Sequence, residues 1–177
     1  GKIPGEAPFG ERLYGDIVKV GDKVILAPHR AKELAVYDIN SGSFDKVPLK
    51  NNYKMASRFA RMLQYKDFVF LLPTYYPAFL RYNVKTGECK YYPELISQLK
   101  KRIPDKEGPM FTSAVCKVDN RFFAASAKAN LVLEFNMDTG EYLIHTVGRQ
   151  KDNFFRIQHD GKDFWLISNT GRAITRW

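Results

Sequence analysis

The chain has 177 residues, 45% of them apolar and 14% aromatic, and its formal net charge is +9 from 28 basic and 19 acidic side chains. This composition is sufficient for one sizeable core and excludes a disordered chain. Apolar runs are only a few residues long, so we expect no membrane span. The positive charge favours an acidic partner, but the densest basic cluster is short, Lys100–Arg102. We therefore expect dispersed charge on a solvated surface, and the sequence argues against nucleic acid as a partner.

The chain consists of a short irregular segment followed by repeats. Residues 1–14 contain Pro4, Pro8 and three glycines, which disfavour a strand. From residue 15 onward, one pattern of short apolar strands and polar turns occurs three times and begins a fourth, which is typical of propellers and solenoids. The predicted repeats span residues 15–50, 56–93, 111–148 and 153–177.

Each complete repeat predicts four strands, rich in Val, Ile, Leu, Phe and Tyr and bounded by turn residues. In chain order, the first repeat gives 17–20, 23–28, 34–38 and 43–47, and the second gives 60–64, 68–73, 79–83 and 88–92. A polar insertion at 95–108 follows, with a short helix predicted at Pro93–Arg102. The third repeat gives strands at 113–118, 121–126, 131–136 and 141–147, and the fourth gives only three, the last at 173–177.

The turns between the third and fourth strands share an aromatic residue, then Asp or Asn, then glycine four residues later. They run Tyr37–Gly42, Tyr82–Gly87 and Phe135–Gly140. The Asp or Asn side chain accepts hydrogen bonds from its own turn, and the glycine adopts a positive φ. The second strands, such as 68–73, are almost continuously apolar, as expected of strands buried on both faces.

These aromatic-Asp/Asn-x-x-Ser/Thr-Gly segments resemble the β-propeller repeat superfamily, which includes kelch, quinoprotein-like and related bacterial repeats. The resemblance covers nearly everything after residue 14. It implies an all-β propeller of about four four-stranded antiparallel blades, the last incomplete. It implies no particular activity, because propellers serve as binding modules, enzymes and scaffolds.

Two arrangements follow from the incomplete fourth repeat. Residues 1–14 supply the missing strand and four blades close a ring, or the repeats form part of a propeller of about six to eight blades. We favour the second arrangement because prolines and glycines make residues 1–14 a poor strand. An unclosed arc exposes a blade face and a strand edge, so self-association is expected.

Propellers bind ligands on the face that carries the loops between second and third strands and the links between blades. Cationic, aromatic and amide side chains gather there, and such groups recognise a small anionic or carbohydrate-like ligand or a partner protein. The alternative is that polar residues simply populate exposed loops. The predicted ligand-binding residues are His29, Arg30, Arg58, Tyr75, Tyr76, Lys128, Asn130 and Arg172.

Two rival functions remain open at this point. One is a propeller-type lyase or hydrolase with His29 as general base; the other is a polyanion-binding domain, suggested by the charge of +9. No catalytic residue is assigned, and whether the chain is an enzyme is left open. We expect no cofactor and no metal, because the three histidines lack ligand spacing. Cys89 and Cys116 are predicted to be free thiols, which slightly favours the cytoplasm.

Overall fold

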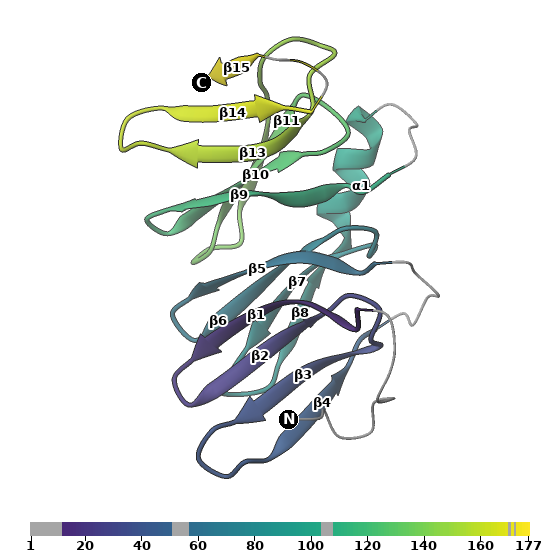
Figure 1. Ribbon diagram of the computed structural model, residues 1–177, viewed down its shortest axis with the longest axis vertical. Coiled ribbons are helices and arrows are strands. Elements are labelled where there is room, and N and C mark those ends of the chain that lie inside the picture. The colour runs from purple at the N-terminus through teal and green to yellow at the C-terminus, as the bar shows by residue number, and fades with distance from the viewer. Residues whose placement is uncertain (1–11, 51–56, 104–107, 170, 172) are drawn as a thin grey trace. The chain divides into compact units, whose positions relative to one another are not determined.

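The computed structural model describes residues 12–50, 57–103, 108–169, 171 and 173–177, and forms two compact units, Gly1–Tyr92 and Pro93–Trp177. The described part of each contains two antiparallel sheets, which we call sheets 1 and 2 in the first unit and sheets 3 and 4 in the second (Figure 1).

The described residues of the first unit form eight strands in simple meander order. Sheet 1 consists of β1 (Tyr14–Val20), β2 (Lys23–Pro28), β3 (Glu33–Asp38) and β4 (Phe44–Pro48). Sheet 2 consists of β5 (Phe59–Tyr65), β6 (Phe68–Pro73), β7 (Phe79–Asn83) and β8 (Cys89–Tyr92).

The second unit begins with a helix, α1 (Pro93–Arg102), at the residues predicted for it. Sheet 3 consists of β9 (Phe111–Val118), β10 (Arg121–Ser126), β11 (Leu131–Asn136) and β12 (Tyr142–Thr146). Sheet 4 has three strands in the described residues, β13 (Phe154–His159), β14 (Phe164–Ser168) and β15 (Ile174–Arg176). The repeated antiparallel four-strand pattern, incomplete in its last copy, is therefore confirmed.

The hairpin turns have the predicted chemistry. Asp38 Oδ1 accepts hydrogen bonds from the backbone N–H groups two and three residues later, at 3.0 and 2.9 Å, and Asn83 and Asn136 do the same in their turns. The glycines that follow have φ values of 69°, 76° and 81° at Gly42, Gly87 and Gly140. The left-handed conformation is thus used at the same place in three hairpins.

Within each unit, two sheets pack face to face through an apolar core. In the first unit Ile25 and Val36 of sheet 1 share this core with Leu71 and Leu80 of sheet 2. In the second unit Phe123 and Ala125 of sheet 3 share a core with Ile157 and Leu166 of sheet 4. Burying such side chains contributes about 25 cal/mol per Å² of apolar surface, which makes this stacking the dominant stabilising term.

The first strand of each sheet (β1, β5, β9 or β13) is called here the innermost strand. A register shift recurs near the start of this strand in every sheet. The pairing slips between Tyr14 and Asp16, between Phe59 and Arg61, between Phe154 and Arg156, and opposite Ala124–Ser126 in sheet 3. A bulge bends the strand locally and increases its twist. The sequence pattern did not predict these bulges, which lie next to the loops that follow the second strands.

Replacing Gly87 with valine should destabilise the first unit by about 1 kcal/mol or more, because φ is +76° there and a β-branched residue is strained in that region. A Cβ at this position meets no atom within 4 Å, so the cost comes from the backbone and not from a clash. Urea unfolding measures the free energy of unfolding, and Gly87→Asn is the matched control, because Asn tolerates this conformation better. Equal losses in the two variants would contradict the explanation.

Candidate ligand-binding loops

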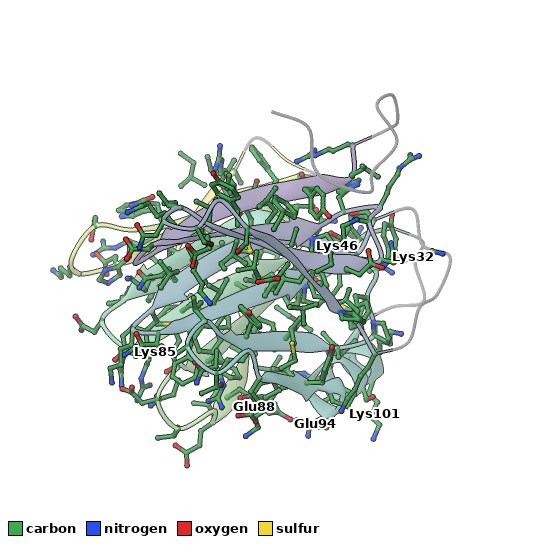
Figure 2. All side chains as sticks on the ribbon, turned by 90° about the horizontal axis from the view of Figure 1, so that it is seen from below. Lys32, Lys46, Lys85, Glu88, Glu94 and Lys101 are labelled. Atoms are coloured by element: carbon green, nitrogen blue, oxygen red, sulfur yellow. The ribbon has the colours of Figure 1, made fainter. Side chains whose placement is uncertain are left out.

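In the first unit, the loops after the second strands are tied to the backbone that precedes the innermost strands. The carbonyl of Leu13 accepts hydrogen bonds from the N–H groups of His29, Arg30 and Ala31 at 2.8, 3.0 and 3.0 Å. We call the end of the sheets with these loops the loop end and the opposite end the turn end. Figure 2 shows Lys32 of the β2–β3 loop and Lys85 of the β7–β8 turn at opposite ends of this unit.

The same anchor recurs in the other sheets. The carbonyl of Arg58 accepts from the N–H of Thr74 at 2.8 Å, and that of Met110 accepts from Ala127 at 3.0 Å. In sheet 4, the carbonyl of Asn153 accepts from Asn169 at 2.8 Å. Each loop is therefore held at a fixed place beside its own innermost strand, which is the arrangement a preformed site needs.

Arg58 joins the loops of sheets 1 and 2. Its backbone N–H donates to the carbonyl of His29 at 2.8 Å, and its Nη1 donates to the carbonyl of Arg30 at 2.9 Å. The residue is only 3% exposed. Burial lowers the pKa of the Arg58 guanidinium, while nearby Tyr76 and Glu33 raise it. A cation is thus buried directly beneath the β2–β3 loop.

Tyr76 is placed next to Arg58 but lies inside the protein. It is 2% exposed, its ring centroid is 4.9 Å from that of Phe59, and its hydroxyl donates to the carbonyl of Lys50. Burial raises the pKa of Tyr76 above its usual range. Its neighbour Tyr75 is 45% exposed, so Tyr75 is the aromatic side chain of this loop that faces solvent.

His29 lies in the β2–β3 loop against Gly15, where an added Cβ would come within 3.4 Å of the His29 Cβ. Its Nδ1 is buried and has no hydrogen-bond partner among the described residues, and the same is true of the Thr74 hydroxyl. Burial lowers the pKa of His29, and the charge of Arg12 lowers it further, against the effect of a hydrogen bond with the Arg12 backbone. On balance, these effects disfavour the protonated form of His29 in the folded protein.

The predicted site residues divide between the two units. The structure brings His29, Arg30, Arg58 and Tyr76 together in the first unit, with Tyr75 on the same loop as Tyr76. In the second unit, the N–H of Lys128 donates to the Ser126 hydroxyl at 3.1 Å, and the carbonyl of Asn130 accepts from Val147 at 2.8 Å. Arg172 lies outside the described residues.

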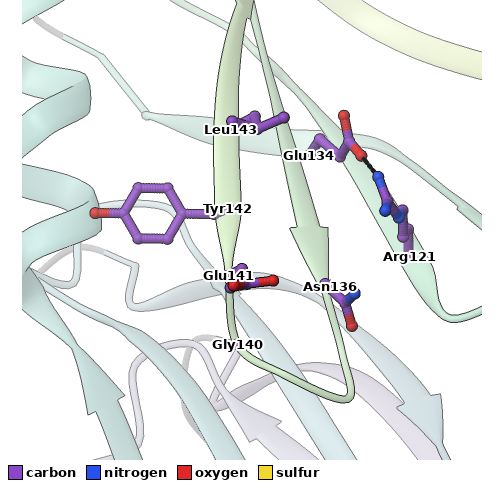
Figure 3. A pocket seen from close by; sticks show the side chains of 7 residues that line it. All are labelled: Arg121, Glu134, Asn136, Gly140, Glu141, Tyr142 and Leu143. Carbon is purple, nitrogen blue, oxygen red and sulfur yellow. Dashed lines mark hydrogen bonds and ion pairs between the residues drawn. The ribbon is translucent and has the colours of Figure 1, made fainter.

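A second polar cluster, in sheet 3, was missed by the sequence reasoning (Figure 3). Glu134 on β11 is 9% exposed, and its two carboxylate oxygens contact Arg121 Nη1 and, at 2.6 Å, His145 Nε2. The Trp177 ring centroid lies 4.9 Å from that of His145. The sequence does contain one signal of this cluster. Glu134 is a carboxylate in an otherwise apolar strand, at the position that Val36 occupies in the first repeat.

Glu134 and Arg121 line an open pocket of about 440 Å³ on sheet 3 (Figure 3). The other lining residues are Asn136, Gly140, Glu141, Tyr142 and Leu143. Leu143 is 58% exposed, so an apolar wall faces solvent next to the Glu134 cluster.

The other ionisable side chains of the described residues form no metal centre. No group of three or more His, Cys, Asp or Glu side chains is arranged to hold a metal within the described ranges. Cys89 and Cys116 are free thiols, and burial raises the pKa of both, to about 11 for Cys116. In the part of the chain that the structure describes, no helix is long and apolar enough to cross a membrane.

Comparison with known proteins identifies the fold and no family. No family model and no curated protein sequence matches the chain. Among solved structures, a catalytically inactive virginiamycin B lyase from Staphylococcus aureus with quinupristin is 17% identical, with a TM-score of 0.66 over 92% of this chain and 51% of the lyase. BamB from Moraxella catarrhalis is 14% identical, with a TM-score of 0.55 over 92% of this chain and 42% of BamB.

The extracellular domain of the one-component system BT4673 from B. thetaiotaomicron is also similar, at 12% identity and a TM-score of 0.64 over 90% of this chain and 20% of that one. At such identities the likeness shows the fold alone. Together with the sheet order, it establishes that this chain is built from β-propeller blades, as the repeat pattern indicated. The chain spans about half the length of the lyase it matches.

Replacing Arg58 with alanine should destabilise the first unit by about 1–3 kcal/mol, because the Arg30 carbonyl loses a buried charged donor. Arg61 is the matched control: its side chain is 44% exposed and lies 3.6 Å from Asp16. Arg61→Ala should cost less than about 1 kcal/mol, as exposed ion pairs do. Urea unfolding measures both variants, and a loss in Arg61→Ala as large as in Arg58→Ala would contradict the role given to Arg58.

The first unit should lose stability as the pH falls from 7 towards 5. The unfolded chain takes up a proton on His29 at the ordinary pKa of 6.5, whereas the folded state takes it up only at lower pH. Acid therefore favours the unfolded state below pH 6.5. Above pH 6.5 the first unit has the full stability that depends on His29 being neutral. His29→Gln should reduce this slope in urea titrations at several pH values; an unchanged slope would show that His29 is not its source.

Proposed function

We propose that the chain is a propeller binding module that recognises a small anionic ligand at the loop end of its first unit. The observation that supports this most directly is the pair of hydrogen bonds from Arg58 to the carbonyls of His29 and Arg30. These bonds fix the loop that carries His29 and Arg30 against the start of sheet 2. A site with loops already held in place loses little conformational entropy on binding, and this favours affinity for a small ligand.

The charges at the loop end suit an anion. Arg12 lies close enough to His29 to lower its pKa, Arg30 is exposed on the loop, and Arg58 is buried beneath it. Glu33 is the acidic residue that acts on Arg58. Guanidinium groups bind carboxylates and phosphates through two parallel hydrogen bonds, and exposed Tyr75 offers an aromatic face beside them.

Catalysis by His29 has less support. A neutral imidazole can act as a base, but a catalytic histidine is usually oriented by an acidic partner. The charged group that shifts the pKa of His29 is Arg12, which is a cation. The similarity to a lyase is at 17% identity and shows the fold alone. Binding without catalysis is therefore the function we favour. A general polyanion-binding role would differ from it because its affinity would fall steeply with salt concentration.

Titration with sodium phosphate and sodium citrate at constant ionic strength, followed by amide NMR, tests the proposal. We expect saturable shifts at His29, Arg30, Thr74 and Tyr75. Arg30→Gln should weaken binding at least about five-fold, because one charged hydrogen-bonding group is lost. Lys85→Gln at the turn end is the control, since its side chain is 74% exposed and remote from the loops.

Shifts spread over all exposed lysines and arginines, or equal weakening by both variants, would refute a loop-end site. Shifts spread over all exposed basic residues would also favour the polyanion-binding alternative. In that case a ten-fold rise in salt concentration should abolish the binding.

A further inference from the structure

Two polar side chains at the loop end of the first unit each have an unsatisfied atom. His29 directly follows β2 and Thr74 directly follows β6, so they occupy the same position in the first and second repeats. His29 Nδ1 and Thr74 Oγ1 are buried and have no hydrogen-bond partner among the described residues. A buried polar atom without a partner has lost its hydration and gained nothing in exchange. Both atoms therefore need a physical explanation.

The backbone holds these two side chains in equivalent places. The N–H of His29 donates to the carbonyl of Leu13, and that of Thr74 donates to the carbonyl of Arg58, both at 2.8 Å. Arg58 also donates its own N–H to the carbonyl of His29 at 2.8 Å. A single residue, Arg58, thus bonds through its backbone to both loops. His29 and Thr74 therefore belong to one place on the loop end of sheets 1 and 2.

The two unsatisfied atoms differ in the hydrogen bonds they can make. A neutral imidazole has one N–H donor and one acceptor nitrogen. A hydrogen bond with the Arg12 backbone raises the pKa of His29, as donation from a ring N–H to a carbonyl does. Because Nδ1 has no partner, this N–H is the one at Nε2. Nδ1 is then an acceptor that needs a donor, whereas the Thr74 hydroxyl can both donate and accept.

An anion without a proton cannot satisfy both atoms. Its oxygens only accept, so they suit the Thr74 hydroxyl but face the lone pair of His29 Nδ1. Protonation of His29 would remove this conflict, but burial and the charge of Arg12 lower the pKa of His29 and oppose it. An anion with its own O–H meets both needs, because a charged oxygen accepts from Thr74 while the O–H donates to Nδ1.

We propose that the loop end of the first unit selects anions that carry an O–H on or beside the charged group, such as hydrogen phosphate or a hydroxycarboxylate. This inference rests on the proposed function, because it specifies the ligand class of the same site. His29 Nδ1 accepts from the ligand, Thr74 donates to it, and exposed Arg30 of the same loop supplies positive charge. Both unsatisfied atoms are closed to solvent in the free protein, so binding includes a local rearrangement of side chains, which is common at binding sites.

Two pairs of anions that differ by one O–H test this selectivity. At pH 8 and constant ionic strength, hydrogen phosphate is compared with sulfate, and citrate with propane-1,2,3-tricarboxylate, by the shifts of the loop amides in NMR. The member with the O–H should bind at least about ten-fold more tightly, because a site built to hydrogen-bond a ligand O–H rejects the analogue that lacks it. A preference within the phosphate pair alone identifies a phosphate ligand, and one within the citrate pair alone identifies a hydroxy acid; either supports the proposal.

The variant His29→Gln tests the source of the preference. A glutamine amide can donate as well as accept, so the affinities for hydrogen phosphate and sulfate should become equal within about two-fold. A merely structural role of His29 would weaken both anions together and leave the ratio of their affinities unchanged. His159→Gln in the second unit is the matched control and should leave this ratio as it is in the parent chain.

The variant Thr74→Val removes the unsatisfied hydroxyl and keeps the shape of the side chain. Without ligand it should be at least as stable as the parent chain in urea unfolding, because no buried polar atom is left without a partner. Its affinity for hydrogen phosphate should fall at least about five-fold, since one hydrogen bond to the anion is lost. Thr86→Val at the turn end is the control: Thr86 Oγ1 accepts from the N–H of Glu88 at 3.3 Å, so this variant should keep the phosphate affinity.

Equal affinities within both anion pairs would overturn the proposal and leave anion binding at the loop end intact. An unchanged ratio in His29→Gln would also overturn it. So would a loss of stability in ligand-free Thr74→Val, because the hydroxyl would then have its partner inside the protein. Absence of loop-end shifts with all four anions would instead refute the proposed function itself, and this inference with it.

Discussion

The structure depends on central strands that are apolar on both faces. Val69, Phe70, Leu71 and Leu72 of β6 are all fully buried, and because successive side chains point to opposite faces, each face of this strand must be covered. A sheet with one face in water cannot satisfy that requirement. Stacking of sheet 1 on sheet 2 covers the face that carries Val69 and Leu71, and sheets 3 and 4 share a core in the same way.

Stacking also determines where polar chemistry can lie. The faces are taken by apolar contacts, so functional groups are left to the loop end, the turn end and any uncovered edge. At the loop end of the first unit, the carbonyls of Leu13 and Arg58 hold the β2–β3 and β6–β7 loops, and the buried Arg58 side chain joins them. In sheet 3, Glu134 is the exception: a carboxylate on a packed face, which its contacts with Arg121 and His145 make tolerable.

The fold was predictable from the sequence because each of the three complete repeats carries the same local signals, such as the Asn83 turn with Gly87 and the apolar run of β6. The arrangement of the candidate site was predictable only in part. Loop residues such as His29 and Arg58 were found from their place in the repeat, but burial of Arg58 and Tyr76 depends on packing between sheets. The Arg121–Glu134–His145 contacts required the register of three strands, in which His145 lies opposite Val132. Neither periodicity nor turn chemistry specifies which charged side chains meet across strands.

Native-state hydrogen exchange on the loop amides tests the central claim that stacked sheets hold preformed loops. The account predicts that the amides of Ala31, Thr74, Ala127 and Asn169, each bound to a carbonyl ahead of an innermost strand, exchange as slowly as amides within their own sheets. Exchange of these four amides at the rate of an unstructured peptide, while the strands stay protected, would contradict it.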